Sequence, residues 1–166
     1  MLRIKKYGDP VLRRKTAVIL VVDSDIRKLA LDMLEVMYMV DGVGLAAPQV
    51  GISLRLCVVD VDLNKKSPVI MVNPEVISGE KRVLAWEGCL SFPGVSGEVM
   101  RFCNIIVRYI DLNRKVCVIK VQNLLARAIQ HEVDHLDGKL FIDYFSWYKR
   151  KNLEREIKRK KKIGEW

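Results

Sequence analysis

The chain has 166 residues, half of them hydrophobic, and a formal net charge of +9. This length and apolar content fit one domain, residues 1–166, with a core of its own. No signal peptide and no apolar run of about 18 residues is present, which excludes a membrane protein. Its four cysteines form no C-x-x-C pair, which argues against a disulfide scaffold. We therefore expect a cytoplasmic protein.

The first predicted helix runs from about Asp25 to Val40, with Asp23 or Ser24 as its N-cap. Its apolar side chains recur at helical spacing and form one stripe, which we assign to the core. The stripe consists of Ile26, Leu29, Met33, Met37 and Val40.

The next segment, Asp41–Gly51, is rich in glycine and small residues, which let a ligand or other backbone approach closely. Pro48 prevents a continuing helix. The segment lacks both the third glycine of a dinucleotide fingerprint and the Gly-Lys-Ser/Thr ending of a P-loop, so we exclude nucleotide binding.

Strands are predicted in the middle of the chain. They are residues 54–61, 69–72 and 82–85, separated by turns at 64–68 and 77–80, then a hairpin of 105–111 and 116–121 around Leu112–Lys115. The segment Trp86–Val95 is predicted to be a loop and carries Cys89. The other three cysteines lie in strand-like runs, where a thiol behaves as a small hydrophobe.

The only two histidines, His131 and His135, follow a run of strong helix formers, and Gly138 is a predicted helix stop. Residues i and i+4 share a helix face, so both imidazoles can bind one metal ion, as in the H-E-x-x-H pattern of zinc hydrolases. Glu132 is rotated about 100° from His131. It can therefore take a proton from a metal-bound water.

A catalytic zinc-type site requires a third protein ligand. The longer protease pattern fails, because Phe141 stands where its last histidine would be. Glu154 and Glu156 lie in a polybasic segment, which is a poor wall for a metal cavity. Cys89, in its glycine-flanked loop, is the best third ligand, and a metal would stabilise its thiolate.

The chain ends in a predicted basic helix or tail, residues 149–166, in which nine Lys or Arg and three Glu give +6 of the net charge. A solvated charged helix and a surface that binds anions such as RNA phosphates both fit this composition. The segment contains no motif that reads bases, so no sequence-specific nucleic-acid binding is expected.

Three short segments in this order resemble the signatures of the peptide deformylase family. They are Gly42–Gln49, Glu87–Ser91 and Gln130–His135. The similarity extends from Gly8 to about Asp143. Two departures lie outside the signatures. Asn123 stands where glycine is expected, and Phe102 stands where a smaller residue or proline is common.

The resemblance implies a metal-dependent hydrolase that removes the formyl group from N-terminal formyl-methionine of nascent polypeptides. Cys89, His131 and His135 would bind the metal. A metal-bound water would attack the formyl carbon, with Glu132 as the general acid and base.

The family also implies donors for the oxyanion and a peptide site. The donors would be the Gln49 side-chain amide and the Leu90 backbone N–H. Gly44 would offer backbone to the peptide, and Gly88 and Ile129 would help form the methionine pocket.

Fe²⁺ is the metal that the resemblance implies, with Zn²⁺, Ni²⁺ or Co²⁺ as substitutes. We further expect Arg101 and Asp134 to pair and brace the metal-binding helix. Nascent-chain substrates emerge at the ribosome, so the basic tail could bind the ribosome.

The expected fold is α+β, with antiparallel or mixed strands packed around the H-E-x-x-H helix, and the Asp25–Val40 helix outside them.

Two rival functions fit parts of the sequence. An H-E-x-x-H endopeptidase would take its third ligand from downstream, so Cys89 would be dispensable for its metal. A non-enzymatic ribosome- or RNA-binding protein would use the basic tail and would not depend on Glu132.

Overall fold

The computed structural model describes residues 2–62, 64–65, 67–164 and 166. Its helices are α1 (Ser24–Met39), α2 (Asn123–Leu136) and α3 (Trp147–Lys162), with short 3-10 helices η1 (Pro10–Arg13), η2 (Ala47–Val50) and η3 (Phe141–Tyr144). Its strands are β1 (Gly44–Ala46), β2 (Leu56–Val59), β3 (Val69–Gly88), β4 (Ser96–Ile110) and β5 (Val116–Gln122). No helix in the described part of the chain combines the length and apolar character that a bilayer crossing requires.

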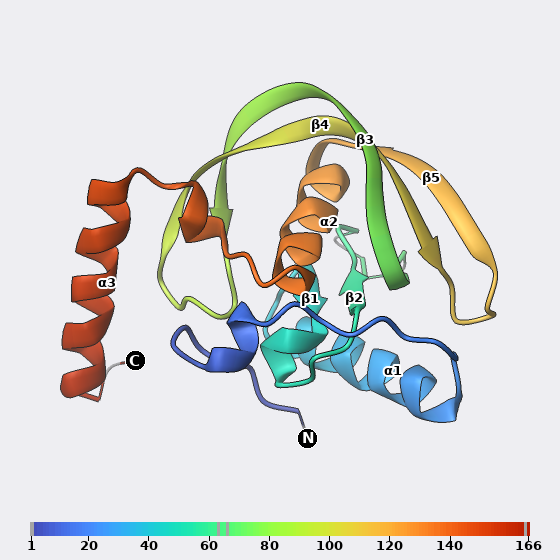
Figure 1. Cartoon of the computed structure of the whole chain (residues 1–166), viewed down its shortest axis with the longest axis horizontal. Helices are drawn as coiled ribbons and strands as arrows, with labels where there is room; N and C mark the ends of the chain where they lie inside the picture. The colour runs from blue at the N-terminus through green and yellow to red at the C-terminus, as the bar shows by residue number, and fades with distance from the viewer. Residues whose placement is uncertain (1, 63, 66, 165) are drawn as a thin grey trace.

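The five strands form one antiparallel sheet in the order β1-β2-β3-β4-β5. The long strands β3 and β4 arch over α2, while α1 lies on the other side near β1 and β2, and α3 stands at the edge of the molecule (Figure 1). The α+β prediction, with strands around the helix that carries the two histidines, is confirmed. The strands named here pair in antiparallel fashion, so no mixed sheet forms among them.

The predicted N-terminal helix is confirmed within one residue at each end as α1. The Asp23 carboxylate caps it by accepting a hydrogen bond from the Ile26 N–H at 2.9 Å. Met33 and Met37 are buried in the core, and Ile26 and Leu29 pack against it, as predicted. The prediction is wrong for Val40, which follows the end of α1 and is exposed. The buried face of α1 packs against β1 and β2 and so supports the short edge strand β1.

The prediction of two separate strands at 69–72 and 82–85 is wrong, because both belong to the 20-residue strand β3. The segment predicted as a turn, 77–80, stays in the ladder, with Gly79 opposite Ile105 of β4. Two register shifts, between Val72 and Glu75 and between Val76 and Ser78, precede this paired segment. The predicted loop Trp86–Val95 is also shorter, since Trp86, Glu87 and Gly88 end β3.

Other strand predictions hold in their centres. The predicted strand 54–61 is trimmed to β2, and 105–111 is the end of the longer β4. The β4–β5 hairpin turns at Leu112–Lys115, where the Asp111 N–H donates to the Lys115 carbonyl oxygen at 2.9 Å. The predicted turn at 64–68 includes Lys66, which lies outside the described residues.

Three apolar clusters hold these layers together. One joins α1 to β1, β2 and η2, a second lies between α2 and the sheet, and a third joins η1, η3 and α3. In the second cluster, Ile105 and Val107 of β4 and Ile129 of α2 are fully or almost fully buried. This packing holds α2 under the arch, with the face that bears His131 and His135 turned toward the end of β3.

Candidate metal centre and active site

His131 and His135 lie one turn apart on the same face of α2. Their ring centroids are 5.0 Å apart, and the two residues are only 8% and 1% exposed. The helix ends as the sequence predicts, because Gly138 adopts a left-handed φ of +72° just after Asp137. Both residues are therefore buried on a well-defined helix face.

Cys89 follows the last residue of β3 and brings its thiol to the two rings. Its Sγ atom lies 3.2 Å from His135 Nε2. The ligand atoms of Cys89, His131 and His135 all lie within 4.8 Å of one another. The structure thus brings together the three residues predicted as metal ligands, although 42 positions of the sequence separate Cys89 from His131. One thiol and two imidazoles form a donor set that suits zinc and ferrous iron.

The two imidazoles have opposite electrostatic environments. Burial disfavours the charged form of His131, but hydrogen bonds to Cys89 and Glu87 outweigh burial and raise the pKa of His131 well above its usual value. Burial and the neighbouring His131 lower the pKa of His135 well below its usual value. A metal ion binds neutral imidazoles and a thiolate, so its binding would release protons from this site.

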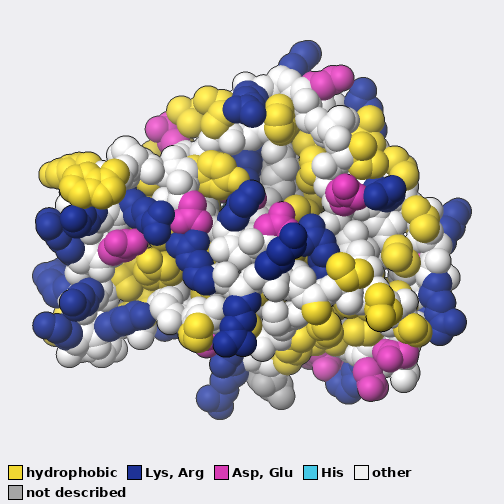
Figure 2. Space-filling model, viewed as in Figure 1, with side chains coloured by type: hydrophobic (Ala, Val, Ile, Leu, Met, Phe, Trp, Pro, Cys, Tyr) yellow, Lys and Arg dark blue, Asp and Glu magenta, His cyan; other side chains and the backbone are white. Residues whose placement is uncertain are grey.

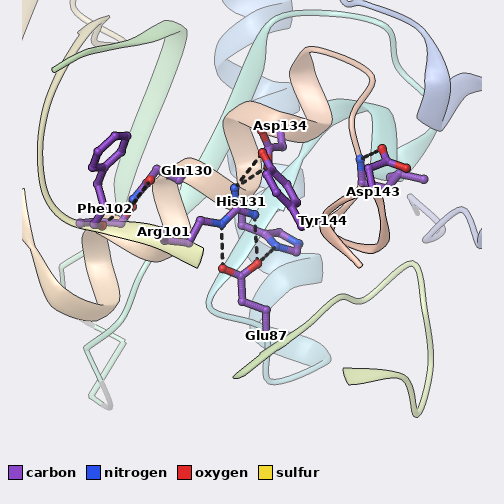
Figure 3. Close-up of polar contacts among 10 residues, drawn as sticks. Glu87, Arg101, Phe102, Gln130, His131, Asp134, Asp143 and Tyr144 are labelled. Carbon is purple, nitrogen blue, oxygen red and sulfur yellow. Dashed lines mark hydrogen bonds and ion pairs between the residues drawn. The ribbon is translucent and has the colours of Figure 1, made fainter. Parts of the chain in front are cut away.

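Glu87 organises the side of the site behind His131. Its Oε2 lies 3.0 Å from His131 Nδ1, and both of its oxygens accept hydrogen bonds from Arg101, at 2.8 and 3.0 Å (Figure 3). Burial opposes its ionisation, but the bonds from His131 and Arg101 lower the pKa of Glu87 to about 2. No role was predicted for Glu87, because the segment Trp86–Val95 was predicted to be a loop and the strand that positions this side chain was missed.

The predicted pair of Arg101 and Asp134 exists and extends this network. Arg101 donates from NH1 to Asp134 at 2.5 Å, and the Tyr144 hydroxyl donates to the same oxygen at 2.9 Å (Figure 3). Both side chains of the ion pair are nearly buried. Strands β3 and β4, helix α2 and η3 are thereby joined around the back of His131.

Glu132 lies beside the three predicted ligands and is almost without partners. It is 3% exposed, and its Oε2 atom accepts no hydrogen bond from the described residues. Burial raises the pKa of Glu132 to about 7. A carboxyl group with a pKa near neutrality can both accept and donate a proton at physiological pH.

Gly44 of β1 makes room for this carboxylate. A Cβ atom at Gly44 would lie 2.3 Å from Glu132 Oε1, far inside van der Waals contact. Within the described part of the chain, β1 is an edge strand that pairs with β2 alone, so its other edge can pair with another backbone. Gly44, whose backbone is predicted to bind the substrate peptide, therefore also determines where the Glu132 carboxylate lies.

Gln49 and Leu90 lie on the same side of the cavity as Cys89. The Gln49 Oε1 atom accepts the Ala46 N–H at 2.7 Å, which turns its Nε2 toward Cys89 Sγ, 3.6 Å away. Among the described residues, the Leu90 N–H has no hydrogen-bond acceptor. Two N–H donors thus remain available next to the predicted ligands.

An open cavity of about 760 Å³ gives access to these groups. Gly44, Gly88, Leu90 and Gln49 line it together with Cys89, His131 and Glu132.

The structure does not place Ile129 in the lining of this cavity, because this residue is fully buried in the cluster between α2 and the sheet. Ile129 is about 200° around the helix from His131, so it points away. Leu124, Arg127 and Ala128 line the cavity from α2.

The two departures from the family pattern are accommodated locally. Asn123 begins α2 with a left-handed φ of +56°, a conformation that asparagine tolerates better than most residues. The Phe102 ring fills the space above Gly79, where a Cβ atom would lie 2.4 Å from it. Gln130 bonds the Phe102 backbone at both its N–H (3.0 Å) and its carbonyl oxygen (2.8 Å), which fastens α2 to β4 (Figure 3).

Comparisons with known proteins agree on one family. A sequence model of the family "Polypeptide deformylase" matches residues 1–151. A peptide deformylase of Endomicrobium trichonymphae is 61% identical, over 99% of this chain and 98% of its own length. One from Nitrosococcus oceani is 43% identical, again over 99% of this chain and 98% of its own length.

Solved structures give the same result. A peptide deformylase from Legionella pneumophila superposes with a TM-score of 0.92 and 38% identity, covering 99% of this chain and 97% of that one. One from Thermotoga maritima superposes with a TM-score of 0.83 and 43% identity, covering 88% and 98% of the two chains.

Proposed function

Because this chain belongs to the peptide deformylase family, whose members are metal-dependent hydrolases that remove the formyl group from N-formylmethionine, we propose how its own residues perform that reaction. The observation that carries the proposal is the convergence of Cys89, His131 and His135 beside the buried carboxylate of Glu132. We further propose that residues 1–166 form one catalytic domain that works in the cytoplasm.

Cys89, His131 and His135 would hold Fe²⁺, and Zn²⁺, Ni²⁺ or Co²⁺ would substitute. The donor set supports these metals, and the resemblance to deformylases favours iron. Glu87 would orient His131 through its Nδ1 atom, as outer carboxylates do for metal-binding histidines. When bound, the ion would supply a Lewis acid that acidifies water and polarises the formyl oxygen.

Glu132 would move the proton. Its carboxylate takes a proton from the attacking water and then passes it to the methionine nitrogen as the C–N bond to the formyl group breaks. The raised pKa of Glu132, about 7, supports both steps at neutral pH. Gly44 keeps this carboxylate in place while its open strand edge supports pairing with the substrate backbone.

Gln49 and Leu90 would stabilise the negative charge that develops on the formyl oxygen. Besides the N–H that donates to Cys89 Sγ, the Gln49 Nε2 amide has a second N–H, which can donate there together with the Leu90 N–H. Each such donor is worth about 100-fold in rate or more. Gly88 would line the methionine pocket.

The basic tail would bind the ribosome. Lys and Arg side chains gather at the edge of the molecule where α3 lies (Figure 2), and Ile157 is the only buried residue of this helix. A helix with this charge and exposure can bind the phosphates of RNA electrostatically, independent of the RNA sequence. Removing the segment after Tyr148 should abolish co-sedimentation with ribosomes and leave formate release from short peptides intact. Equal co-sedimentation with and without the segment would refute this part.

Formate release from formyl-Met-Ala-Ser by the protein loaded anaerobically with Fe²⁺ tests the activity. We expect turnover by the wild type and none by Glu132→Gln, with the metal retained in both. An endopeptidase would instead keep its metal after Cys89→Ala, and a protein that only binds RNA would release no formate in any metal form.

A further inference from the structure

One face of α2 forms a wall of the substrate cavity, and it carries an arginine that the reaction does not use. Leu124, Arg127, Ala128 and His131 follow the i, i+3, i+4, i+7 spacing of a single helix face, and all four line the cavity. Arg127 therefore lies one turn, about 6 Å along the helix axis, from the predicted metal ligand His131. Three of these residues have a role in metal binding or apolar packing, and the charge of Arg127 has none.

Arg127 has no anionic partner within the described part of the chain. It takes part in no ion pair or hydrogen bond there, although it is partly buried. None of the acids that line the same cavity forms an ion pair with Arg127 in the described part of the chain. Glu87 is bound by Arg101 and His131, and the exposed carboxylate of Asp41 faces Lys65 at 3.2 Å. Glu132 is buried and left without a cation.

The position of Arg127 on a wall shared by two cavities limits where its charge can lie. Besides the substrate cavity, it lines a smaller one of about 140 Å³ together with Leu124 and Asn123. Arg101 also lines the smaller cavity, and its guanidinium is neutralised by Glu87 and Asp134. An arginine packs its aliphatic stem on apolar surface and keeps its guanidinium in water. The stem of Arg127 therefore suits the wall of the methionine pocket, and its guanidinium the mouth.

We propose that Arg127 selects substrates with an acidic side chain at the third residue, counting formyl-methionine as the first. This inference rests on the binding of an extended formyl peptide in the cavity, as proposed above. Side chains of an extended chain alternate, so the first and third residues point to the same side, about 6.6 Å apart. With methionine against Leu124 and Ala128, the third side chain passes over the guanidinium of Arg127.

Amidated tripeptides test the proposal, because they carry no terminal carboxylate that could mimic an acidic side chain. We expect the wild type to process formyl-Met-Ala-Glu-NH2 with a kcat/KM about two- to fivefold above that for formyl-Met-Ala-Lys-NH2, the factor typical of a solvent-exposed ion pair. The difference should lie in KM and should shrink as ionic strength rises. In Arg127→Gln the ratio should fall to about one, and in Arg127→Glu it should invert.

Arg155→Glu is the matched control, since it changes the net charge equally on the exposed surface of α3. It should keep the wild-type ratio. The inference is overturned if Arg155→Glu shifts the ratio as much as Arg127→Glu, if Arg127→Glu keeps the wild-type ratio, or if the acidic preference lies at the second residue instead. Turnover of formyl-Met-Ala-Gln-NH2 separates this result from the activity itself. Failure of the wild type to release formate from any of these peptides would refute the proposed function.

Discussion

The carboxylate of Glu87 lies 3.0 Å from Nδ1 of His131, on the side of the ring that faces away from Cys89. This contact fixes the ring so that Nε2 points to the predicted metal position. Glu87 reaches it from the end of β3, two residues before Cys89, so one strand end provides both a predicted ligand and the group that orients another. Arg101 holds Glu87 in turn.

Glu87→Gln should weaken metal binding by about 10- to 100-fold, the usual cost of losing an outer carboxylate partner of a metal-binding histidine. The amide keeps the size of the side chain but loses its charge. Of the two carboxylates that pair with Arg101, Asp134 then remains. Competition with a chelator measures the affinity. Glu75→Gln, which removes an exposed carboxylate paired with Arg108, should leave the affinity unchanged. Equal affinity of Glu87→Gln and the wild type would show that this contact does not tune the site.

Gly44→Ala should reduce deformylation by about 100-fold, the cost of displacing a reacting group by about 1 Å. The new methyl carbon would lie 2.3 Å from Glu132 Oε1, and the buried carboxylate must move away. Metal content should stay close to that of the wild type, because the three atoms nearest to the new methyl carbon all belong to Glu132. An alanine variant with full activity would mean that Glu132 has another position during turnover.

Much of the fold and most of the candidate site follow from local patterns. The cap at Asp23, the spacing of His131 and His135, and the stop at Gly138 each depend on residues within a turn or two. Cys89 was found by excluding the downstream candidates. The predictions that were wrong concern contacts between distant parts of the chain. Gly79 looks like a turn residue, but pairing with Ile105 keeps it in a strand.

The methionine pocket shows a different kind of error. Ile129 was taken from the family resemblance, yet the helical period alone places it about 200° from His131. The same period puts Leu124, Arg127 and Ala128 on the side of His131, where the structure has them. The helical period alone is therefore sufficient to predict which residues of α2 line the cavity. The family resemblance named a residue, Ile129, that does not line it.

The packing of α3 against the rest of the protein should weaken at low pH, because Asp143 becomes protonated. Its carboxylate accepts hydrogen bonds from Arg13 at 2.5 and 3.0 Å and pairs with Arg150 of α3 at 3.2 Å. Burial alone would raise the pKa of Asp143, but the bonds from Arg13 and the Leu140 N–H outweigh it and lower the pKa below its usual value. The folded state therefore binds this proton less well than the unfolded state. The contribution is complete above the unfolded pKa and is lost as pH falls through the folded pKa.

Asp143→Asn should accordingly lower the free energy of unfolding by about 1–2 kcal/mol at pH 7. It should also flatten the loss of stability that sets in as pH falls toward and below the unfolded pKa of aspartate, about 3.9. Urea unfolding of the metal-free protein across this range is the measurement. Asp32→Asn serves as the control, because that carboxylate pairs with Lys28 on the exposed surface of α1. If both variants behave alike at all pH values, Asp143 does not hold η1, η3 and α3 together.

Asn123 allows a direct test of the left-handed start of α2. At a φ of +56°, asparagine should be replaceable by glycine with a change of at most about 0.5 kcal/mol, since glycine adopts this conformation freely but also gains freedom in the unfolded chain. Asn123→Ala should destabilise the protein by about 1 kcal/mol, because the Cβ of an ordinary residue is strained there. Asn152→Ala in the regular helix α3 is the matched control and should not destabilise. Urea midpoints of the three variants decide the matter. If Asn123→Ala is as stable as Asn123→Gly, the helix does not begin in the left-handed conformation.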